Sequence, residues 1–264
     1  MKSIRVAVHG ARGKMGREVV RAIWREPAME LVGAVELDPG NDCLLLSDGS
    51  GSVPLSSDLA NIIEHCRPDV LIDFTIALAT MPAVRIATHQ GVNLVIGTTG
   101  LSAEDLSEID RLATANKVGA VVAPNFALGA VLMIHLAKTA AEYFDYAEII
   151  ELHHHLKVDA PSGTAIATAK TIAAAKGKPF RQSLQPKIPS NSRGQQVEGV
   201  TVHSVRLPGI AARQEVLFSG PGQTLSLKHD AISRECYMPG VILATREVMK
   251  LKGLVYGLDS LLGL

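Results

Sequence analysis

The chain has 264 residues, 47% of them hydrophobic, so it can bury the core of one large or two modest domains and is not disordered. Lys plus Arg and Asp plus Glu both number 26, and this formal charge of zero argues against a large binding surface for nucleic acid or an anionic membrane. The chain shows no signal-like leader, no apolar run of about 18 residues and only three widely spaced cysteines, which predicts a cytoplasmic protein with reduced thiols.

Short apolar runs alternate with helical patterns in the first half of the chain. Runs typical of buried β-strands occur at residues 4–8, 31–35, 70–74, 94–96 and 118–122. Patterns with helical spacing occur between them, at residues 14–24, 59–65, 81–89 and 103–115. Strands that alternate with crossover helices predict an α/β domain with a parallel sheet covered on both faces.

The pattern changes after Asn125. The elements expected there are helices at residues 127–144, 162–175 and 239–251, and strands at residues 147–153, 200–207, 214–218 and 224–228. Consecutive strands with short Gly-containing links predict a mixed or antiparallel sheet, and so a second domain of α+β type. We therefore expect a dinucleotide-type domain at residues 1–125, completed by residues 235–264, and a second domain at residues 126–234.

Three glycines join the first expected strand to the first helix, in the sequence Gly10-Ala-Arg-Gly13-Lys-Met-Gly16. They permit a tight turn, close approach of the backbone to a pyrophosphate, and close packing of helix on strand, while the helix start offers N–H donors to phosphates. The next strand ends at Glu36, whose carboxylate can accept hydrogen bonds from an adenosine ribose. This context predicts dinucleotide binding; a tight turn without a ligand is the alternative.

The residue after Glu36 bears on the choice of dinucleotide. An arginine there would offer a partner for the 2′-phosphate of NADP, but the chain has Leu37. We therefore expect NAD(P)H as the cofactor, with a preference towards NADH. Arg12 and Lys14 in the glycine turn could still contact a 2′-phosphate, so use of both dinucleotides stays open.

Two further loops follow predicted strands at the edge where open parallel sheets bind ligands. They are Gly97-Thr98-Thr99-Gly100 and Ala123-Pro124-Asn125-Phe126. Both offer polar groups near the expected position of a nicotinamide, and we interpret them as cofactor contacts. Taken singly, each is also typical of an ordinary loop.

The segment from Glu151 to Ala165 contains three consecutive histidines and a lysine. Histidine is the side chain whose ordinary pKa lies closest to neutral pH. Across the end of the expected strand, His153 and His155 would share one face and His154 would lie on the other, unless a bend after the strand brings His154 back to the site. Together with Lys157, these residues predict a site for proton transfer and for an anionic ligand.

A helix is expected to begin soon after this cluster. Ser162 is a good N-cap, so Gly163 and Thr164 would offer the first free backbone N–H groups. Free amides at a helix start bind carboxylates, and Thr164 adds a hydroxyl. Zinc is the sharpest alternative for the histidines, but neighbours on a strand point apart and no HxxxH or HExxH spacing is present, so we expect no metal.

These motifs together resemble those of the 4-hydroxy-tetrahydrodipicolinate reductase family, also called dihydrodipicolinate reductases, over essentially the whole chain. The resemblance rests on the glycine turn preceded by Val8-His9, on the two loops above, and on the segments Asp73-Phe-Thr75 and Glu151-Leu-His-His-His-Leu-Lys157-Val-Asp-Ala-Pro-Ser-Gly-Thr-Ala165. It implies a Rossmann-like N-terminal domain, a second domain that binds a small dicarboxylate substrate, and a homotetramer formed through the sheet of that second domain.

The resemblance also implies a role for each site residue. His153 corresponds to the family's proton donor and acceptor, and Lys157 to its proton donor. The residues that correspond to substrate contacts are His154, Gly163 and Thr164. Those that correspond to cofactor contacts are Gly10, Ala11, Arg12, Gly13, Lys14, Met15, Glu36, Gly97, Thr98, Thr99, Ala123, Pro124, Asn125 and Phe126. The chain departs from the family at Leu37, where several members carry an arginine that helps to hold NADP.

The implied reaction is the NAD(P)H-dependent reduction of 4-hydroxy-tetrahydrodipicolinate, a cyclic unsaturated imine with two carboxylates, in lysine and diaminopimelate biosynthesis. Hydride would go to the carbon that loses a hydroxyl, and His153 or Lys157 would deliver a proton. Another two-domain dehydrogenase, such as a semialdehyde dehydrogenase, would need a nucleophilic cysteine, but the cysteines lie away from the predicted strand-end loops, at Cys43, Cys66 and Cys236. A non-catalytic dinucleotide sensor would keep the glycine turn without needing the histidines and lysine.

Overall fold

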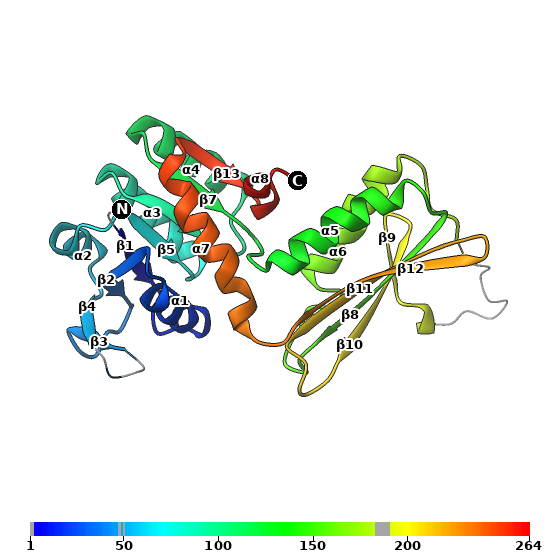
Figure 1. Ribbon diagram of the computed structural model, residues 1–264, viewed down its shortest axis with the longest axis horizontal. Coiled ribbons are helices and arrows are strands. Elements are labelled where there is room, and N and C mark those ends of the chain that lie inside the picture. Colours follow the sequence, from blue (N-terminus) through cyan, green and yellow to red (C-terminus); the bar gives the residue numbers. More distant parts are fainter. Residues whose placement is uncertain (1–2, 47–48, 50, 183–190) are drawn as a thin grey trace. The chain divides into compact units, whose positions relative to one another are not determined.

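An eight-stranded sheet forms the centre of Met1–Leu128 and Glu235–Leu264, the first of two units into which the chain divides (Figure 1). The structure, a computed structural model, describes residues 3–46, 49, 51–182 and 191–264. The second unit comprises Gly129–Arg234. Each unit has its own sheet and its own cluster of buried apolar residues.

The strands of the first unit lie in the order β13-β7-β6-β5-β1-β2-β4-β3, and all neighbouring pairs are parallel except β3 and β4. Their bounds are β1 Ile4–His9, β2 Met29–Val35, β3 Cys43–Leu45, β4 Ser52–Ser56, β5 Val70–Asp73, β6 Asn93–Ile96, β7 Gly119–Val122 and β13 Gly253–Tyr256. Every residue of β5 and β7 is buried, as expected where helices cover both faces of a parallel sheet. The predicted parallel α/β sheet is confirmed.

Helices cover the two faces of this sheet as two groups. The helices of the unit are α1 Lys14–Arg25, α2 Leu59–Cys66, α3 Ala77–His89, α4 Ala103–Asn116, α7 Met238–Glu247 and α8 Leu258–Leu262, with 3-10 turns at Arg234–Tyr237 and Val248–Lys250. Helices α2, α3 and α4 share a buried cluster with alternate strand residues such as Leu71 and Leu94. The intervening Ile72 and Val95 are buried outside that cluster, towards the face of α1 and α7, which contact each other.

Three strands of this sheet lie outside the elements expected from the sequence. The strand β3 has only three residues and the pattern of β4 is interrupted by Pro54, so neither segment predicts a strand. The strand β13 has four residues, of which only Gly253 is buried. Helix α3 begins at Ala77, before the expected start at residue 81. The helix contains Pro82 in its interior, where a proline is usually a poor helix former.

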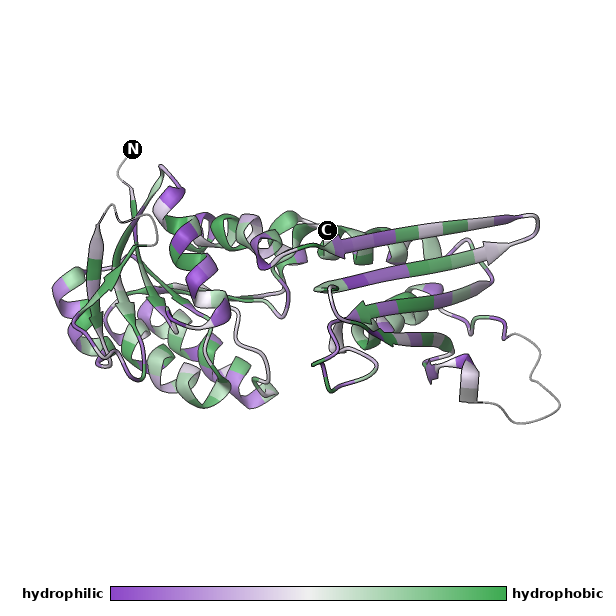
Figure 2. Cartoon of the chain, turned by 90° about the horizontal axis from the view of Figure 1, so that it is seen from below, coloured by the Kyte–Doolittle hydropathy of each residue, from purple (hydrophilic) through white to green (hydrophobic). Residues whose placement is uncertain are grey.

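The second unit is a five-stranded mixed sheet with two helices on one face. Its strands lie in the order β12-β11-β8-β10-β9, in which β8 and β10 are parallel and the other pairs antiparallel. The bounds are β8 Tyr146–His153, β9 Gln195–Val197, β10 Val200–Arg206, β11 Ala212–Gly220, β12 Gln223–Ala231, α5 Leu128–Ala141 and α6 Gly163–Lys176, with a 3-10 turn at Asn191–Arg193. Hydrophilic and hydrophobic residues interchange along these strands (Figure 2). The predicted mixed sheet is confirmed.

Small side chains let the helices of the second unit approach its sheet closely. The buried residues that α5 and α6 contribute to the cluster are Ala137, Ala141, Ala165, Ala169 and Ile172. They pack on a sheet face that includes Phe218, whose ring lies 5.7 Å from that of Phe144 and 6.5 Å from that of Phe180. In neither unit does a helix of the described residues have the length and apolar character needed to cross a membrane.

Candidate active site

The glycine turn between β1 and α1 is fixed by backbone geometry. Gly10 has a φ of +77°, and a side chain at Gly16 would overlap the carbonyl oxygen of Gly10, so both positions require glycine. The N–H groups of Gly10 and Ala11 donate to the end of β2, at 2.9 and 3.4 Å. That of Gly13 donates to the carbonyl of Gly10 at 3.0 Å. These donors therefore already have partners in the turn and at the end of β2.

Helix α1 begins with backbone donors that have no partner among the described residues. Gly13 is its N-cap, no side chain caps it, and its first turn holds no acidic residue. The open N–H groups belong to Lys14, Met15 and Gly16. Together with the positive end of the helix dipole, they form a site that fits the pyrophosphate of a dinucleotide.

Glu36 lies directly after β2, next to the glycine turn. Its carboxylate accepts hydrogen bonds from the backbone N–H groups of Arg12, at 2.9 Å, and of Leu37, at 3.1 Å. These bonds hold the carboxylate in place and leave it lone pairs for the hydroxyls of a ribose. The side chain of Leu37 is 92% exposed and carries no charge.

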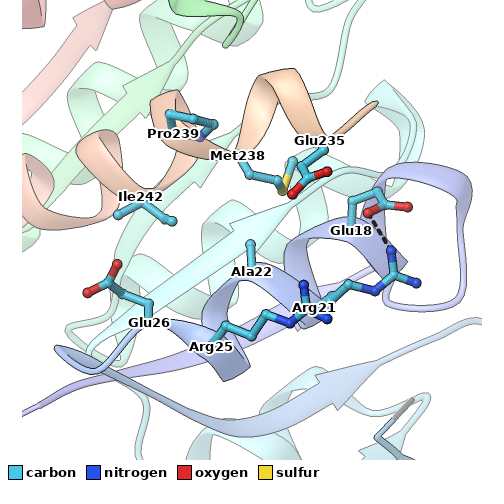
Figure 3. Close-up of a pocket in the computed structure, with 9 residues that line it drawn as sticks. All are labelled: Glu18, Arg21, Ala22, Arg25, Glu26, Glu235, Met238, Pro239 and Ile242. Carbon is cyan, nitrogen blue, oxygen red and sulfur yellow. Dashed lines mark hydrogen bonds and ion pairs between the residues drawn. The ribbon is translucent and has the colours of Figure 1, made fainter. Parts of the chain in front are cut away.

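The described residues of the first unit form at least two pockets. One, of about 340 Å³, adjoins the glycine turn and is lined by Ala11, Arg12, Arg17, Val20, Arg21, Trp24, Leu44, Leu45 and Leu46. It combines an apolar wall with three guanidinium groups. The other, of about 400 Å³, lies between α1 and α7 (Figure 3) and is lined by Glu18, Arg21, Ala22, Arg25, Glu26, Glu235, Met238, Pro239 and Ile242. No residue predicted as a cofactor or substrate contact lines this second pocket.

The buried carboxylate of Asp73 ties together the ends of β1, β5 and β6. Its Oδ1 accepts hydrogen bonds from the N–H and hydroxyl of Thr75, at 2.8 and 2.6 Å, and from the hydroxyl of Thr98, at 3.2 Å. The Nδ1 of His9 lies 3.5 Å from Oδ2. Burial raises the pKa of Asp73, but the interactions with His9 and Thr75 outweigh it and lower the pKa. An ionised Asp73 therefore fixes the loops at this edge of the sheet.

Internal packing occupies part of the two predicted cofactor loops. A side chain at Gly97 would overlap the ring of Phe74, which packs on Phe126 with ring centroids 5.7 Å apart and an interplanar angle of 55°. Ala123 and Phe126 are buried. Within this unit, the members of the loops that keep exposed surface are Gly97, Thr99, Gly100, Pro124 and Asn125.

His153 is the last residue of β8, and a buried carboxylate holds its ring. The Nδ1 of His153 lies 2.5 Å from Oε2 of Glu151, a residue on the same strand face that is 0% exposed. Arg206, on the neighbouring β10, donates two hydrogen bonds to the same carboxylate, at 2.9 and 2.8 Å. The N–H of Ser162 donates to Oε1 at 3.2 Å. One carboxylate thus joins His153, β10 and the start of α6.

Glu151 is ionised although it is buried. Burial raises its pKa, but hydrogen bonds from His153, Arg206 and Ser204 outweigh this effect and lower the pKa to about 2. The side chain therefore carries a negative charge at neutral pH, which the guanidinium of Arg206 balances.

The strand β8 ends at His153, so the alternation expected for the three histidines stops there. The pairing of β8 with β10 ends at Arg206, and the N–H of Lys157 donates to the carbonyl of His154 at 3.0 Å, which closes a turn. The prediction that His153 and His155 share a strand face is therefore wrong. His155 is exposed and His154 half-buried.

Lys157 lies in that turn, with its Nζ 2.8 Å from a carboxylate oxygen of Asp159. This hydrogen bond is the main cause of a lowered pKa at Asp159. The guanidinium of Arg206 donates to the backbone carbonyls of both residues, at 3.3 Å for Lys157 and 2.6 Å for Asp159. The side chain that pairs with Glu151 therefore also holds the turn that carries the ammonium.

Helix α6 begins at Gly163, after its N-cap Ser162, whose hydroxyl accepts a hydrogen bond from the N–H of Ala165 at 3.2 Å. The first turn has no acidic residue, and the N–H groups of Gly163 and Thr164 have no acceptor within the described ranges. A side chain at Gly163 would meet nothing within 4 Å. The helix start is therefore open and suits a carboxylate.

Glu151 and Arg206 are functional candidates that the sequence motifs did not single out. An acid two positions before His153, at the end of a largely apolar strand, is a signal for Glu151. Arg206 is 55 positions from Glu151, and only the pairing of β10 with β8 brings them together. In the part of the chain that the structure describes, no group of three or more His, Cys, Asp and Glu side chains is placed to hold a metal ion.

Comparison with known proteins matches the chain along nearly its full length. The family model described as "Dihydrodipicolinate reductase, N-terminus" matches residues 4–126, and that described as "Dihydrodipicolinate reductase, C-terminus" matches residues 129–262. A protein of Dehalococcoides mccartyi (strain BAV1) named 4-hydroxy-tetrahydrodipicolinate reductase is 53% identical over 264 residues, covering 100% of both chains. One of the same name from Moorella thermoacetica is 49% identical and covers 98% of each chain.

Solved structures agree with these matches. The dipicolinate-bound dihydrodipicolinate reductase from Paenisporosarcina sp. TG-14 has a TM-score of 0.86 and 42% identity, over 98% of this chain and 99% of that one. An amine dehydrogenase from Mycobacterium smegmatis, at 18% identity and a TM-score of 0.66, shares the fold alone. The chain therefore belongs to the dihydrodipicolinate reductase family, the pyridine-nucleotide-dependent oxidoreductases that act in lysine and diaminopimelate biosynthesis.

Proposed function

We propose that this chain reduces 4-hydroxy-tetrahydrodipicolinate to tetrahydrodipicolinate with a reduced nicotinamide dinucleotide. The observation that carries the proposal is the fixed imidazole of His153, held by Glu151, close in sequence to Lys157 and to the open start of α6. A protein that only senses dinucleotides would have no use for this group. The relative from Paenisporosarcina is bound to dipicolinate, a planar ring with two carboxylates, and this supports the substrate class.

The first unit supplies the residues that would hold the dinucleotide. The open donors at the start of α1 would bind the pyrophosphate, and Glu36 would accept hydrogen bonds from the adenosine ribose. Near the nicotinamide, the expected contacts are Gly97, Thr98, Thr99, Ala123, Pro124, Asn125 and Phe126. NADH is expected to be the better cofactor, because Glu36 would repel a 2′-phosphate and Leu37 offers it no charge. Arg12 would partly offset this effect, so NADPH also serves.

The second unit supplies the residues that would hold the dicarboxylate. The N–H groups of Gly163 and Thr164, at the positive end of α6, would bind one carboxylate. The side chains of His154 and Lys157 would supply further contacts and positive charge. The substrate carries two negative charges, so the local cluster provides the attraction that the neutral chain as a whole does not.

His153 and Lys157 are the residues that would transfer protons. When bound, a reduced nicotinamide would supply a hydride to the ring carbon from which the hydroxyl has left as water, and the electron-rich ring then needs a proton. Either Nε2 of His153 or Nζ of Lys157 would donate it as a general acid, an effect typically worth about 10²–10⁴-fold in rate.

The five-stranded sheet would also form the contacts between subunits. On β8, residues that alternate with the buried ones include Ile150 and Leu152, which are half-buried and lie on the face away from α5 and α6. This apolar content supports a homotetramer formed through the sheet. A cytoplasmic location is expected from the sequence and from the biosynthetic role of the family. Light scattering of the purified protein should give the mass of four chains.

NADH consumption tests the proposed reaction. The purified protein is mixed with NADH and with the product of the preceding synthase, generated in situ. A reductase removes the NADH absorbance in proportion to the substrate supplied, whereas a sensor binds NADH and leaves the absorbance flat. Replacing Cys43, Cys66 and Cys236 by serine should leave the rate unchanged, since burial raises the pKa of the Cys66 and Cys236 thiols and so disfavours a thiolate nucleophile.

A further inference from the structure

The carboxylate of Glu151 is held in place where it contacts one ring nitrogen of His153, Nδ1. It receives two hydrogen bonds from Arg206, one from the backbone of Ser162, and the 2.5 Å contact with Nδ1 of His153. Glu151 is 0% exposed and ionised, so it can only accept hydrogen bonds. The hydrogen between the two side chains therefore belongs to the imidazole.

We propose that Glu151 is a positioning residue that keeps the proton of His153 on Nδ1 and so leaves Nε2 to exchange protons with the substrate. A carboxylate that orients a histidine and fixes its tautomer is a recurrent device in proton-transfer sites. Its role in the reaction rests on the proposed function. The position of the proton on the ring does not, and can be measured without substrate or cofactor.

Arg206, on the neighbouring strand β10, also binds the carboxylate of Glu151. Its guanidinium balances the charge of Glu151, which keeps the carboxylate from taking a proton itself. It also donates to the carbonyls of Lys157 and Asp159, so the turn with the ammonium is fixed to the same group. The charged groups around the imidazole are thus Glu151 on β8, Arg206 on β10, and the Lys157–Asp159 pair in the turn.

The first test is the position of the proton in the free enzyme. Magic-angle-spinning ¹⁵N spectra are recorded on full-length protein labelled only at histidine, and the His153 signals are assigned by subtracting the spectrum of His153→Gln. We expect Nδ1 to carry the proton above the pH at which the ring becomes neutral. A neutral ring with the proton on Nε2 overturns the proposal. This measurement uses the unaltered Glu151, and the His153→Gln variant serves only to assign the signals.

The second test is Glu151→Gln, compared with Glu148→Gln as a matched control. Glu148 lies on the same strand, and it also pairs with a histidine, His203 at 2.8 Å, and with Arg193. A neutral amide can accept from Nδ1 or donate to it, so it no longer fixes the tautomer. We expect Glu151→Gln to lower kcat by about 10- to 100-fold with both KM values unchanged. The control should keep wild-type kcat and the wild-type His153 signals.

The pH profile separates positioning from a purely structural role. Removing the negative charge beside the imidazole disfavours the protonated ring, so the limb of the kcat/KM profile that reports His153 should move to lower pH in Glu151→Gln. A loss of kcat with an unmoved limb and unchanged ¹⁵N signals would contradict the proposal. If all variants and the wild type fail to oxidise NADH while the ¹⁵N result holds, the proposed reaction is wrong and the positioning of His153 stands.

Discussion

The guanidinium of Arg206 meets the carboxylate of Glu151 in two hydrogen bonds, 2.9 and 2.8 Å long, across the parallel pair β8 and β10. In this register Arg206 lies opposite His153. Because the same guanidinium donates to the carbonyl of Lys157, one side chain holds both groups that we propose handle protons. The chemistry of the second unit therefore depends on a strand pairing between distant parts of the chain.

His153→Ala should mainly lower kcat. Loss of a general acid typically costs about 10²–10⁴-fold in rate, and the substrate carboxylates would still have the α6 amides and Lys157. Steady-state NADH oxidation measures this effect, with the exposed His155→Ala as the control that should keep wild-type kinetics. An unchanged kcat in His153→Ala would remove the imidazole from the mechanism.

Lys157→Ala should lower kcat and also raise the KM for the dicarboxylate. The ammonium contributes positive charge to substrate binding as well as a proton, and loss of one charge-assisted contact costs roughly tenfold in affinity. Lys170→Ala removes an exposed ammonium elsewhere on α6 and is the matched control. A KM for NADH that rises instead would place Lys157 at the cofactor.

Leu37→Arg should shift cofactor preference towards NADPH. An arginine beside Glu36 offers a 2′-phosphate the partner it lacks, which should raise kcat/KM for NADPH by about tenfold. The kcat/KM for NADH should change little, because Glu36 keeps its two backbone donors. Kinetics with both dinucleotides on one preparation give the ratio, and a ratio equal to that of the unaltered chain argues against an adenosine ribose at Glu36.

Gly16→Ala should weaken both the fold and the binding of NADH. The added methyl would overlap the carbonyl oxygen of Gly10, so the turn must open, at a cost on the order of 1–3 kcal/mol in the free energy of unfolding. Gly51→Ala, whose methyl would meet only ordinary contacts at 3.6 and 4.0 Å, is the control in the same unit. Denaturant unfolding and NADH titration measure the two effects. Equal behaviour of the two variants would contradict the close packing of α1 on β1.

Acid should remove the stabilisation that Glu151 provides. Its pKa is about 2 in the folded chain against an ordinary 4.5, so its contribution is fully present above the ordinary value and is lost as the pH falls towards about 2. That contribution is on the order of 3 kcal/mol. The difference in free energy of unfolding between wild type and Glu151→Gln should therefore shrink between about pH 5 and pH 3. A difference that is independent of pH would mean that the carboxylate is not ionised.

The fold class was predictable where the sequence carries continuous signals. The buried strands β5 and β7 read as unbroken apolar runs because helices cover both faces of their sheet. The strand β13 could not be predicted, because it is short, only Gly253 in it is buried, and it is defined by pairing with β7, which lies far away in the sequence. The strand β4 could not be predicted either, because Pro54 interrupts its pattern. A proline is tolerated at this position because β4 is a short strand near the edge of the sheet.

The site was predictable to the extent that it is local. Ser162 caps α6 as its residue type predicts, and the end of β8 places His153 as expected. A bend after the strand was a possibility that the sequence left open, but where it begins depends on where β10 stops pairing with β8. For the same reason Arg206 gave no signal as a partner of Glu151. Local chemistry could be read from residue types, but long-range pairing needed the structure.

Deuterium transfer is the measurement that tests the proposed reduction most directly. The enzyme is given NADH with deuterium in place of both hydrogens on nicotinamide C4, together with the synthase product made in situ, and the product is analysed by mass spectrometry. We expect tetrahydrodipicolinate that carries one deuterium, formed in step with NADH oxidation. Product without deuterium, or NADH left unoxidised in the presence of substrate, would contradict a reduction by this chain.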